Sequence, residues 1–131
     1  AGRDAAIDVA PYVPAAVSED PEVAKATIRG HIAYYVGNGR GYERAVAQRF
    51  PDAAAAVASA WREGDREGAI NRVTDDMVAA LGVAGRPNTA REQFQAIADI
   101  ECVTRPMVTI PTNADDAMVE RTIETLAPSR Y

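Results

Sequence analysis

The chain has very few of the residues that most often carry catalytic or metal-binding chemistry. Cys102 is its single cysteine, so neither an intrachain disulfide nor a redox pair can form. His31 is its single histidine, and a lone histidine without a cysteine cluster is a poor zinc ligand. No convincing Ser-His-Asp or Cys-His arrangement can be assembled from these residues. We therefore predict that the chain holds no metal.

Basic charge and long apolar runs are also scarce. The 131 residues carry 14 basic and 19 acidic side chains, and the net charge is −5. The basic footprint of a nucleic-acid-binding protein is missing. No apolar run approaches the ~18 residues of a membrane span, and no signal peptide is recognisable. We expect one cytoplasmic domain over residues 1–131 that binds neither nucleic acid nor membrane.

Two apolar segments are predicted to be buried strands. Ile7–Val17 is almost continuously apolar, which is typical of a parallel strand covered on both faces. Pro11 and Pro14 restrict ladder bonding, so its regular part should end near Pro14. Met107–Ile110 is a second, shorter strand, and the proline after it ends it.

Caps and apolar periodicity predict that most of the remaining chain is helical. Asp20 can cap a helix that starts at Pro21 and should end near Gly37–Gly39. The other predicted helices cover Tyr42–Phe50, the segment from Pro51 to Gly64, the segment capped by Thr74, a segment that begins around Pro87–Thr89, and a last helix capped by Asn113 with Val119, Ile123 and Leu126 as its buried stripe.

Two pairs of acidic residues could suggest a metal or acid–base site. Asp75 and Asp76 follow the cap Thr74, and Asp115 and Asp116 open the last helix. The helix dipole favours negative charge in a first turn, and adjacent residues diverge around a helix. We therefore interpret both pairs as structural.

Two buried strands are too few for a sheet of their own, so they need parallel neighbours from elsewhere. Three stretches then show a resemblance in their order and spacing. Val9–Glu22 (VAPYVPAAVSEDPE) resembles a penultimate barrel strand that runs into its helix. Val73–Pro87 (VTDDMVAALGVAGRP) is the second stretch, and in the third, Ala90–Pro111, a helix feeds the last barrel strand. Together they resemble the luciferase-like monooxygenase superfamily, in its deazaflavin-dependent branch of methylenetetrahydromethanopterin reductases.

The resemblance covers most of the chain, with one departure. Arg86 stands before Pro87 where relatives usually carry a small capping residue. Thr89 and Glu92 have the spacing of a capping box and could start this helix two residues later.

The resemblance implies the C-terminal portion of a (β/α)₈ TIM barrel, an α/β fold that is here mostly helical with about two buried parallel-type strands. It also implies an oxidoreductase that transfers a hydride with coenzyme F420 or FMN, with methylenetetrahydromethanopterin as the substrate in this branch. We expect the complete enzyme to hold the cofactor, and this chain alone to be inactive and to bind none tightly.

Four residues are candidates for cofactor contact, because barrel active sites lie at the C-terminal ends of the strands. Tyr12 and Pro14 stand at the end of the first predicted strand. Thr112 and Asn113 follow the second predicted strand, at the N-terminus of the next predicted helix, and a helix N-terminus favours anions. The alternative for Asn113 is a simple helix cap. The tyrosines at 34, 35 and 42 could line the mouth of the barrel or pack at helix ends.

Three hypotheses for the chain remain open. The first is that the chain is a C-terminal fragment or subunit of the oxidoreductase, with the missing barrel half as its partner. The second is that it is a non-catalytic assembly module that forms homo-oligomers through exposed strand edges. The third is that it is a free-standing helical domain in which the two apolar segments are packing segments and are not neighbouring parallel strands.

Overall fold

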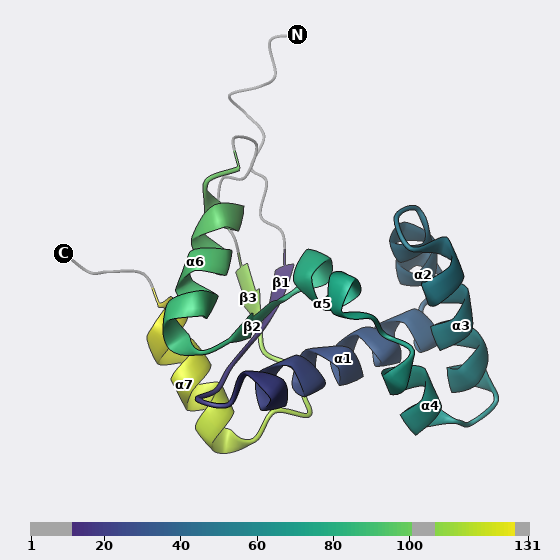
Figure 1. The fold of residues 1–131 in the computed structure, drawn as a ribbon, viewed down its shortest axis with the longest axis horizontal. Coiled ribbons are helices and arrows are strands. Elements are labelled where there is room, and N and C mark those ends of the chain that lie inside the picture. The colour runs from purple at the N-terminus through teal and green to yellow at the C-terminus, as the bar shows by residue number, and fades with distance from the viewer. Residues whose placement is uncertain (1–11, 101–106, 128–131) are drawn as a thin grey trace, which may run out of the picture.

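The structure is a computed structural model that describes residues 12–100 and 107–127 (Figure 1). Its elements in chain order are β1 (Tyr12–Val17), α1 (Pro21–Asn38), α2 (Arg40–Ala47), α3 (Pro51–Arg62), α4 (Arg66–Asn71), α5 (Asp75–Leu81), β2 (Val83–Gly85), α6 (Pro87–Ala98), β3 (Met107–Thr109) and α7 (Asp116–Leu126). No helix in these two ranges is long and apolar enough to cross a membrane.

The strands form a parallel sheet with the order β2-β1-β3. Residues 12–14 of β1 pair with β3, and residues 15–17 pair with β2. The two segments predicted as strands are therefore parallel neighbours, which counts against a free-standing helical domain. The prediction that the first strand ends near Pro14 is wrong, since β1 continues to Val17. The pairing partner of β1 changes from β3 to β2 directly after Pro14. The N–H group that Pro14 lacks is therefore missing at the junction between the two ladders.

The third strand, β2, was not predicted. Gly82 caps the C-terminal end of α5, directly before β2. A Cβ on Gly82 would lie 3.0 Å from Cγ2 of Ile28 and 3.2 Å from the carbonyl oxygen of Pro14. Gly82 therefore brings β2 close to both α1 and β1. Three residues are too few to show a strand periodicity in the sequence.

Strands β1 and β2 are buried on both faces, as the apolar first strand predicted, whereas β3 is only partly buried. Val13, Ala15 and Val17 pack in the core under α6 and α7, together with Val83 and Leu126. The alternate residues Ala16 and Ala84 belong to the core under α1. We call β1–β3 with α6 and α7 the sheet layer; Figure 1 shows α6 and α7 beside the strands, away from α2–α4.

The second part of the molecule is a group of helices, α2, α3 and α4, that packs on the C-terminal half of α1 (Figure 1). We call this group the helical arm. Val36 of α1 and the α3 residues Ala54, Val57 and Ala58 are buried in its core. The long helix α1 therefore joins the arm to the sheet layer.

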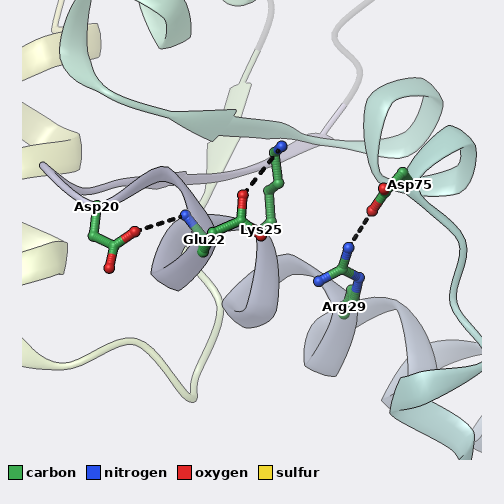
Figure 2. Close-up of polar contacts among 5 residues, drawn as sticks. All are labelled: Asp20, Glu22, Lys25, Arg29 and Asp75. Atoms are coloured by element: carbon green, nitrogen blue, oxygen red, sulfur yellow. Dashed lines mark hydrogen bonds and ion pairs between the residues drawn. The ribbon is translucent and has the colours of Figure 1, made fainter.

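Helix α1 begins as its cap residue predicts and is tied to α5 (Figure 2). The Asp20 carboxylate accepts a hydrogen bond from the backbone N–H of Glu22 at 3.0 Å, and Pro21 is the first helical residue. About two turns further along α1, Arg29 forms an ion pair with Asp75. Asp75, in the first turn of α5, is therefore the ion-pair partner of Arg29 in α1.

The last helix differs from its prediction at both the cap and the buried face. Asp115 is the cap, with its carboxylate accepting from the Met118 N–H at 2.8 Å, so Asn113 is not the cap. Ile123 is 54% exposed, while Thr122 is fully buried. The Thr122 hydroxyl accepts a hydrogen bond from the Val17 N–H at 3.0 Å. Leu126 is buried as predicted, but Met118, Thr122 and Thr125 make up the rest of the buried face in place of Val119 and Ile123.

Helix α6 begins at Pro87, with Arg86 at the cap position and no side-chain cap hydrogen bond. The capping box of Thr89 and Glu92 does not form. Pro87 fits the first helical position because its φ is preset and its missing N–H costs nothing there.

Candidate functional site

A cleft of about 390 Å³ opens between the C-terminal end of β3 and the middle of α1. This volume lies within the range of ~300–1,000 Å³ that is usual for small-molecule sites. In barrels the active site lies at the C-terminal ends of the strands, so the position of the cleft is the one expected for a site.

One wall of the cleft comes from β3 and the loop that follows it. Thr109, Ile110, Thr112 and Asn113 line this strand-side wall. The Asn113 side-chain N–H donates to the carbonyl oxygen of Thr27 at 3.2 Å, which fastens the loop to α1. Thr112 and Asn113 are both exposed, so the Thr112 hydroxyl and the amide oxygen of Asn113 can meet a ligand.

The loop can approach α1 because Gly30 has no side chain. A Cβ on Gly30 would lie 2.7 Å from the Asn113 Nδ2 atom, closer than real Cβ contacts. Gly30 itself lines the cleft. The contact between Gly30 and Asn113 therefore sets how closely the strand-side wall meets α1.

The opposite, helix-side wall is aromatic. It contains His31, Tyr34 and Tyr35 of α1 and Trp61 of α3. The ring centroids of His31 and Tyr35 are 4.7 Å apart, and those of Tyr34 and Trp61 are 5.8 Å apart in an edge-to-face arrangement. Such pairs hold the rings in defined orientations. Tyr34 is 52% exposed and Tyr35 43% exposed, so much of their surface remains open.

Two glycines position the Trp61 end of this wall. A Cβ on Gly37 would lie 2.2 Å from Cγ of Trp61, so the indole packs directly on the backbone of α1. Gly64 has a φ of +87°, a left-handed value that suits glycine, and it turns the chain from α3 into α4. The turn places the Arg66 guanidinium over the Trp61 ring, 4.8 Å from its centroid.

The electrostatics of the cleft differ from those of the chain as a whole. None of the described residues that line it is acidic, and Arg66 supplies a positive charge, although the chain carries a net charge of −5. Burial lowers the pKa of His31 below its ordinary value of 6.5, so its ring is neutral at neutral pH. Burial, and then the neighbouring Tyr35, raise the pKa of Tyr42, which packs behind the wall.

The structure brings together two of the four predicted site residues. Thr112 and Asn113 lie side by side in the cleft. Pro14 is buried inside β1 and does not line it. Tyr12 pairs with Met107 through its backbone, and its side chain lies outside the described residues. Cofactor contact by all four residues stays a prediction.

His31 and Arg66 line the cleft but were not predicted as site residues. The spacing of His31, Tyr34 and Tyr35, three and four residues apart, places them on one helix face and was the available signal. Trp61 packs against the core and also lines the cleft. Nothing local marks Arg66, because it reaches Trp61 only through the turn at Gly64. No cluster of metal-binding side chains occurs within residues 12–100 and 107–127.

Comparison with solved structures identifies the fold. The coenzyme F420-dependent tetrahydromethanopterin reductase from Methanopyrus kandleri resembles the chain with a TM-score of 0.73 and 24% sequence identity, over 94% of this chain and 35% of that one. The chain thus spans about a third of the length of that reductase, which confirms the predicted partial (β/α)₈ barrel. No curated protein sequence matches the chain.

Comparison with protein families identifies the lineage. The sequence profile of the luciferase-like monooxygenases matches residues 1–102, which include β1, the helical arm, β2 and α6. The match covers well over half of the chain and agrees with the superfamily that its sequence resembles. The chain belongs to the luciferase-like monooxygenase family.

Proposed function

We propose that this chain supplies the C-terminal part of a deazaflavin- or flavin-dependent oxidoreductase that transfers a hydride to or from a small substrate. The observation that carries the proposal is the cleft at the C-terminal end of a barrel strand, in a chain of the luciferase-like monooxygenase family. The structurally similar reductase is named for coenzyme F420, so we place the deazaflavin first and FMN second. The same name supports a tetrahydromethanopterin-type substrate and a role in one-carbon metabolism.

The residues of the cleft fit part of such a cofactor. The aromatic wall offers flat surfaces for a ring system, and the strand-side wall offers the Thr112 hydroxyl and the Asn113 amide as hydrogen-bonding groups. When bound, the cofactor supplies the hydride chemistry itself. Thr112 and Asn113, which line the cleft, would hold and orient it. The neutral ring of His31 and the tyrosines would exclude water from the reacting face.

The proposal assigns the rest of the cofactor site to other barrel strands, because the described part of this chain contributes three strands to a fold with eight. Those strands would come from the remainder of the barrel or from a second copy, and we expect the complete protein to be a cytoplasmic oligomer. The chain alone should be inactive.

A second candidate is an assembly module without catalytic activity. The observation that favours it is the outer strand β3, an edge of the described sheet, whose Met107 side chain is 38% exposed. Sedimentation of the 131-residue chain at micromolar concentration tests this candidate. A stable monomer would contradict it.

The first experiment on the proposed function is to isolate the native gene product from its source cells. Intact mass gives its length, and mass spectrometry after denaturation identifies a bound deazaflavin or flavin. We expect a product with the mass of a whole barrel that oxidises reduced coenzyme F420 or FMN. Thr112→Val and Asn113→Ala should each lower its cofactor affinity, whereas Ser59→Ala, on an exposed position of α3 outside the cleft, should not. Absence of either cofactor, or robust hydride transfer by the 131-residue chain alone, would contradict the proposal.

A further inference from the structure

We propose that Asn38 is a self-modification site, which loses its side-chain amide through a cyclic succinimide whenever the last turn of α1 opens. Asn38 is the last residue of α1, and Gly39 is the single residue that separates α1 from α2. The reactants are two neighbouring groups of the chain and water. The proposal therefore concerns the chemical stability of the helical arm and does not depend on the oxidoreductase function.

The reaction joins the side chain of Asn38 to the backbone of Gly39. The Gly39 nitrogen, after losing its proton, attacks Cγ of Asn38, so that a new C–N bond forms and the bond from Cγ to Nδ2 breaks with release of ammonia. Water then opens the ring at either of its carbonyl groups and leaves aspartate or isoaspartate at position 38. The net change is uptake of water and loss of ammonia, with no oxidation or reduction.

The residue that follows each asparagine makes the reaction specific for Asn38. Asn38 is the only one of the four asparagines in the sequence that precedes a glycine. Asn71, Asn88 and Asn113 precede arginine, threonine and alanine, whose Cβ atoms crowd the approach of the backbone nitrogen to the side chain. Asn38 is also exposed, so water can reach the succinimide.

The fold holds both reacting groups in the last turn of α1. The Gly39 N–H donates to the carbonyl oxygen of Tyr35 at 3.0 Å, and the Asn38 side-chain N–H donates to the carbonyl oxygen of Tyr34 at 2.9 Å. Both bonds must break before the Gly39 nitrogen can reach Cγ of Asn38. Local opening at the end of a helix costs less free energy than global unfolding, so the fold slows the reaction without preventing it.

The product weakens the turn that carries two residues of the cleft. An ionised aspartate at position 38 cannot donate to the Tyr34 carbonyl oxygen, and its negative charge is unfavourable at the C-terminus of a helix. Isoaspartate also lengthens the main chain between α1 and α2. Because Tyr34 and Tyr35 line the cleft, the modification reaches its helix-side wall.

Trypsin gives a direct readout of the reaction. Cleavage after Arg29 and Arg40 releases residues 30–40, a peptide in which Asn38 is the only amide side chain. The 131-residue chain is incubated at mildly alkaline pH, both folded and in urea, and mass spectrometry follows the conversion of this peptide. We expect a rate in the folded chain that is at least roughly tenfold lower than in urea. The peptides that contain the other asparagines should stay unchanged over the same period.

Substitution of glycine tests the attacking nitrogen. Gly39→Ala should slow the conversion of Asn38 in urea at least roughly tenfold, because the new Cβ crowds the backbone nitrogen. Gly41→Ala is the matched control, since it adds the same methyl group two residues later and should leave the rate unchanged. Because both variants are compared in urea, the result does not depend on how well either one folds.

Substitution of asparagine tests the effect of the product. Asn38→Asp should raise the equilibrium constant for unfolding roughly three- to tenfold in urea denaturation, because the donor to Tyr34 is lost and a charge is added at the helix C-terminus. Asn88→Asp is the control: Asn88 lies in the first turn of α6, where negative charge is favourable, so its stability should be equal or slightly higher.

The proposal is overturned if Asn38 persists in urea, if the folded chain converts as fast as the unfolded chain, or if Gly39→Ala converts like the unsubstituted chain. An unfolding equilibrium that is the same for Asn38→Asp and the unsubstituted chain would overturn the expected effect on the arm.

Discussion

In the helical arm, the helices that pack together are neighbours in the chain, whereas in the sheet layer the contacting elements lie far apart in the sequence. Helices α2, α3 and α4 follow α1 directly and pack on it. In the sheet layer, the backbone of Val17 bonds the side chain of Thr122, which stands 105 residues later. Apolar contacts between helices that are close in sequence therefore stabilise the arm. Strand pairing and a buried hydrogen bond between distant residues stabilise the sheet layer.

The two regions consequently depend on different single residues. The arm depends on close packing between helices. The Trp61 side chain can pack on the backbone of α1 because Gly37 has no side chain. The sheet layer depends on satisfaction of buried backbone groups, as Thr122 satisfies Val17. The cleft lies where the two regions meet, so its geometry follows from both. Substitutions at these positions can separate the contributions of the arm and of the sheet layer to the stability of the chain.

The largest effect is expected from Gly37→Ala in the arm. The new Cβ would lie within 2.7 Å of three Trp61 atoms, so the indole must move and α3 must shift on α1. We expect the free energy of unfolding to fall by about 2–3 kcal/mol, more than alanine gains in helix propensity. Urea denaturation measures this change. Gly41→Ala is the control, because nothing lies within 4 Å of a Cβ there, and its stability should be equal or slightly higher.

A smaller loss is expected from Thr122→Val in the sheet layer. The substitution keeps the shape of the side chain but leaves the buried Val17 N–H without its acceptor. The expected loss in the free energy of unfolding is about 1–2 kcal/mol. Thr125→Val serves for comparison, because Thr125 is also buried on α7 but is not the acceptor of the Val17 N–H. Equal losses in the two variants would show that the tie to β1 does not stabilise the sheet layer.

A still smaller change is expected from Gly30→Ala, at the junction of the two regions. The Cβ would displace the Asn113 amide from the carbonyl oxygen of Thr27, at a cost below about 1 kcal/mol because that side chain can rotate. In an Asn113→Ala background the same substitution should instead stabilise α1 by up to about 1 kcal/mol. A double-mutant cycle from urea denaturation reveals the change of sign. Additive effects would contradict contact between these residues.

The smallest expected effect is a pH dependence from His31 in the wall of the cleft. Burial lowers its pKa in the folded chain below 6.5, so the unfolded chain binds more protons as the pH falls through this value. The contribution of His31 to stability is therefore complete above pH 6.5 and is lost as the pH drops toward the lower pKa of the folded state. His31→Gln should flatten the fall in urea midpoint between about pH 7 and about pH 5. An unchanged slope would contradict burial of this ring.

The sequence predicted the ends of elements where the signal lies within one turn of chain. Asp20 and Thr74 cap α1 and α5 as expected, because a capping side chain bonds a backbone group two or three residues later. It failed at two other caps, since Asp115 and not Asn113 caps α7 and the capping box of Thr89 and Glu92 does not form. It also failed where a distant partner decides the outcome. The face of α7 is set by its bond to β1, and β2 exists because Val83–Gly85 meets the last residues of β1.

The candidate site divides in the same way. Its strand-side residues Thr112 and Asn113 could be named from the sequence, because the end of a barrel strand marks the position. Arg66 could not, because it becomes part of the cleft only when the turn at Gly64 returns it to Trp61.

By itself, the sequence determined the family resemblance, the helical content and the two strands that pair in parallel, because periodicity, caps and apolar runs act over short distances. Only the tertiary structure decided which face of α7 is buried, where the third strand lies and which aromatic side chains form one wall with a cation. These outcomes depend on contacts between residues tens of positions apart, and no local pattern specifies which residues will meet.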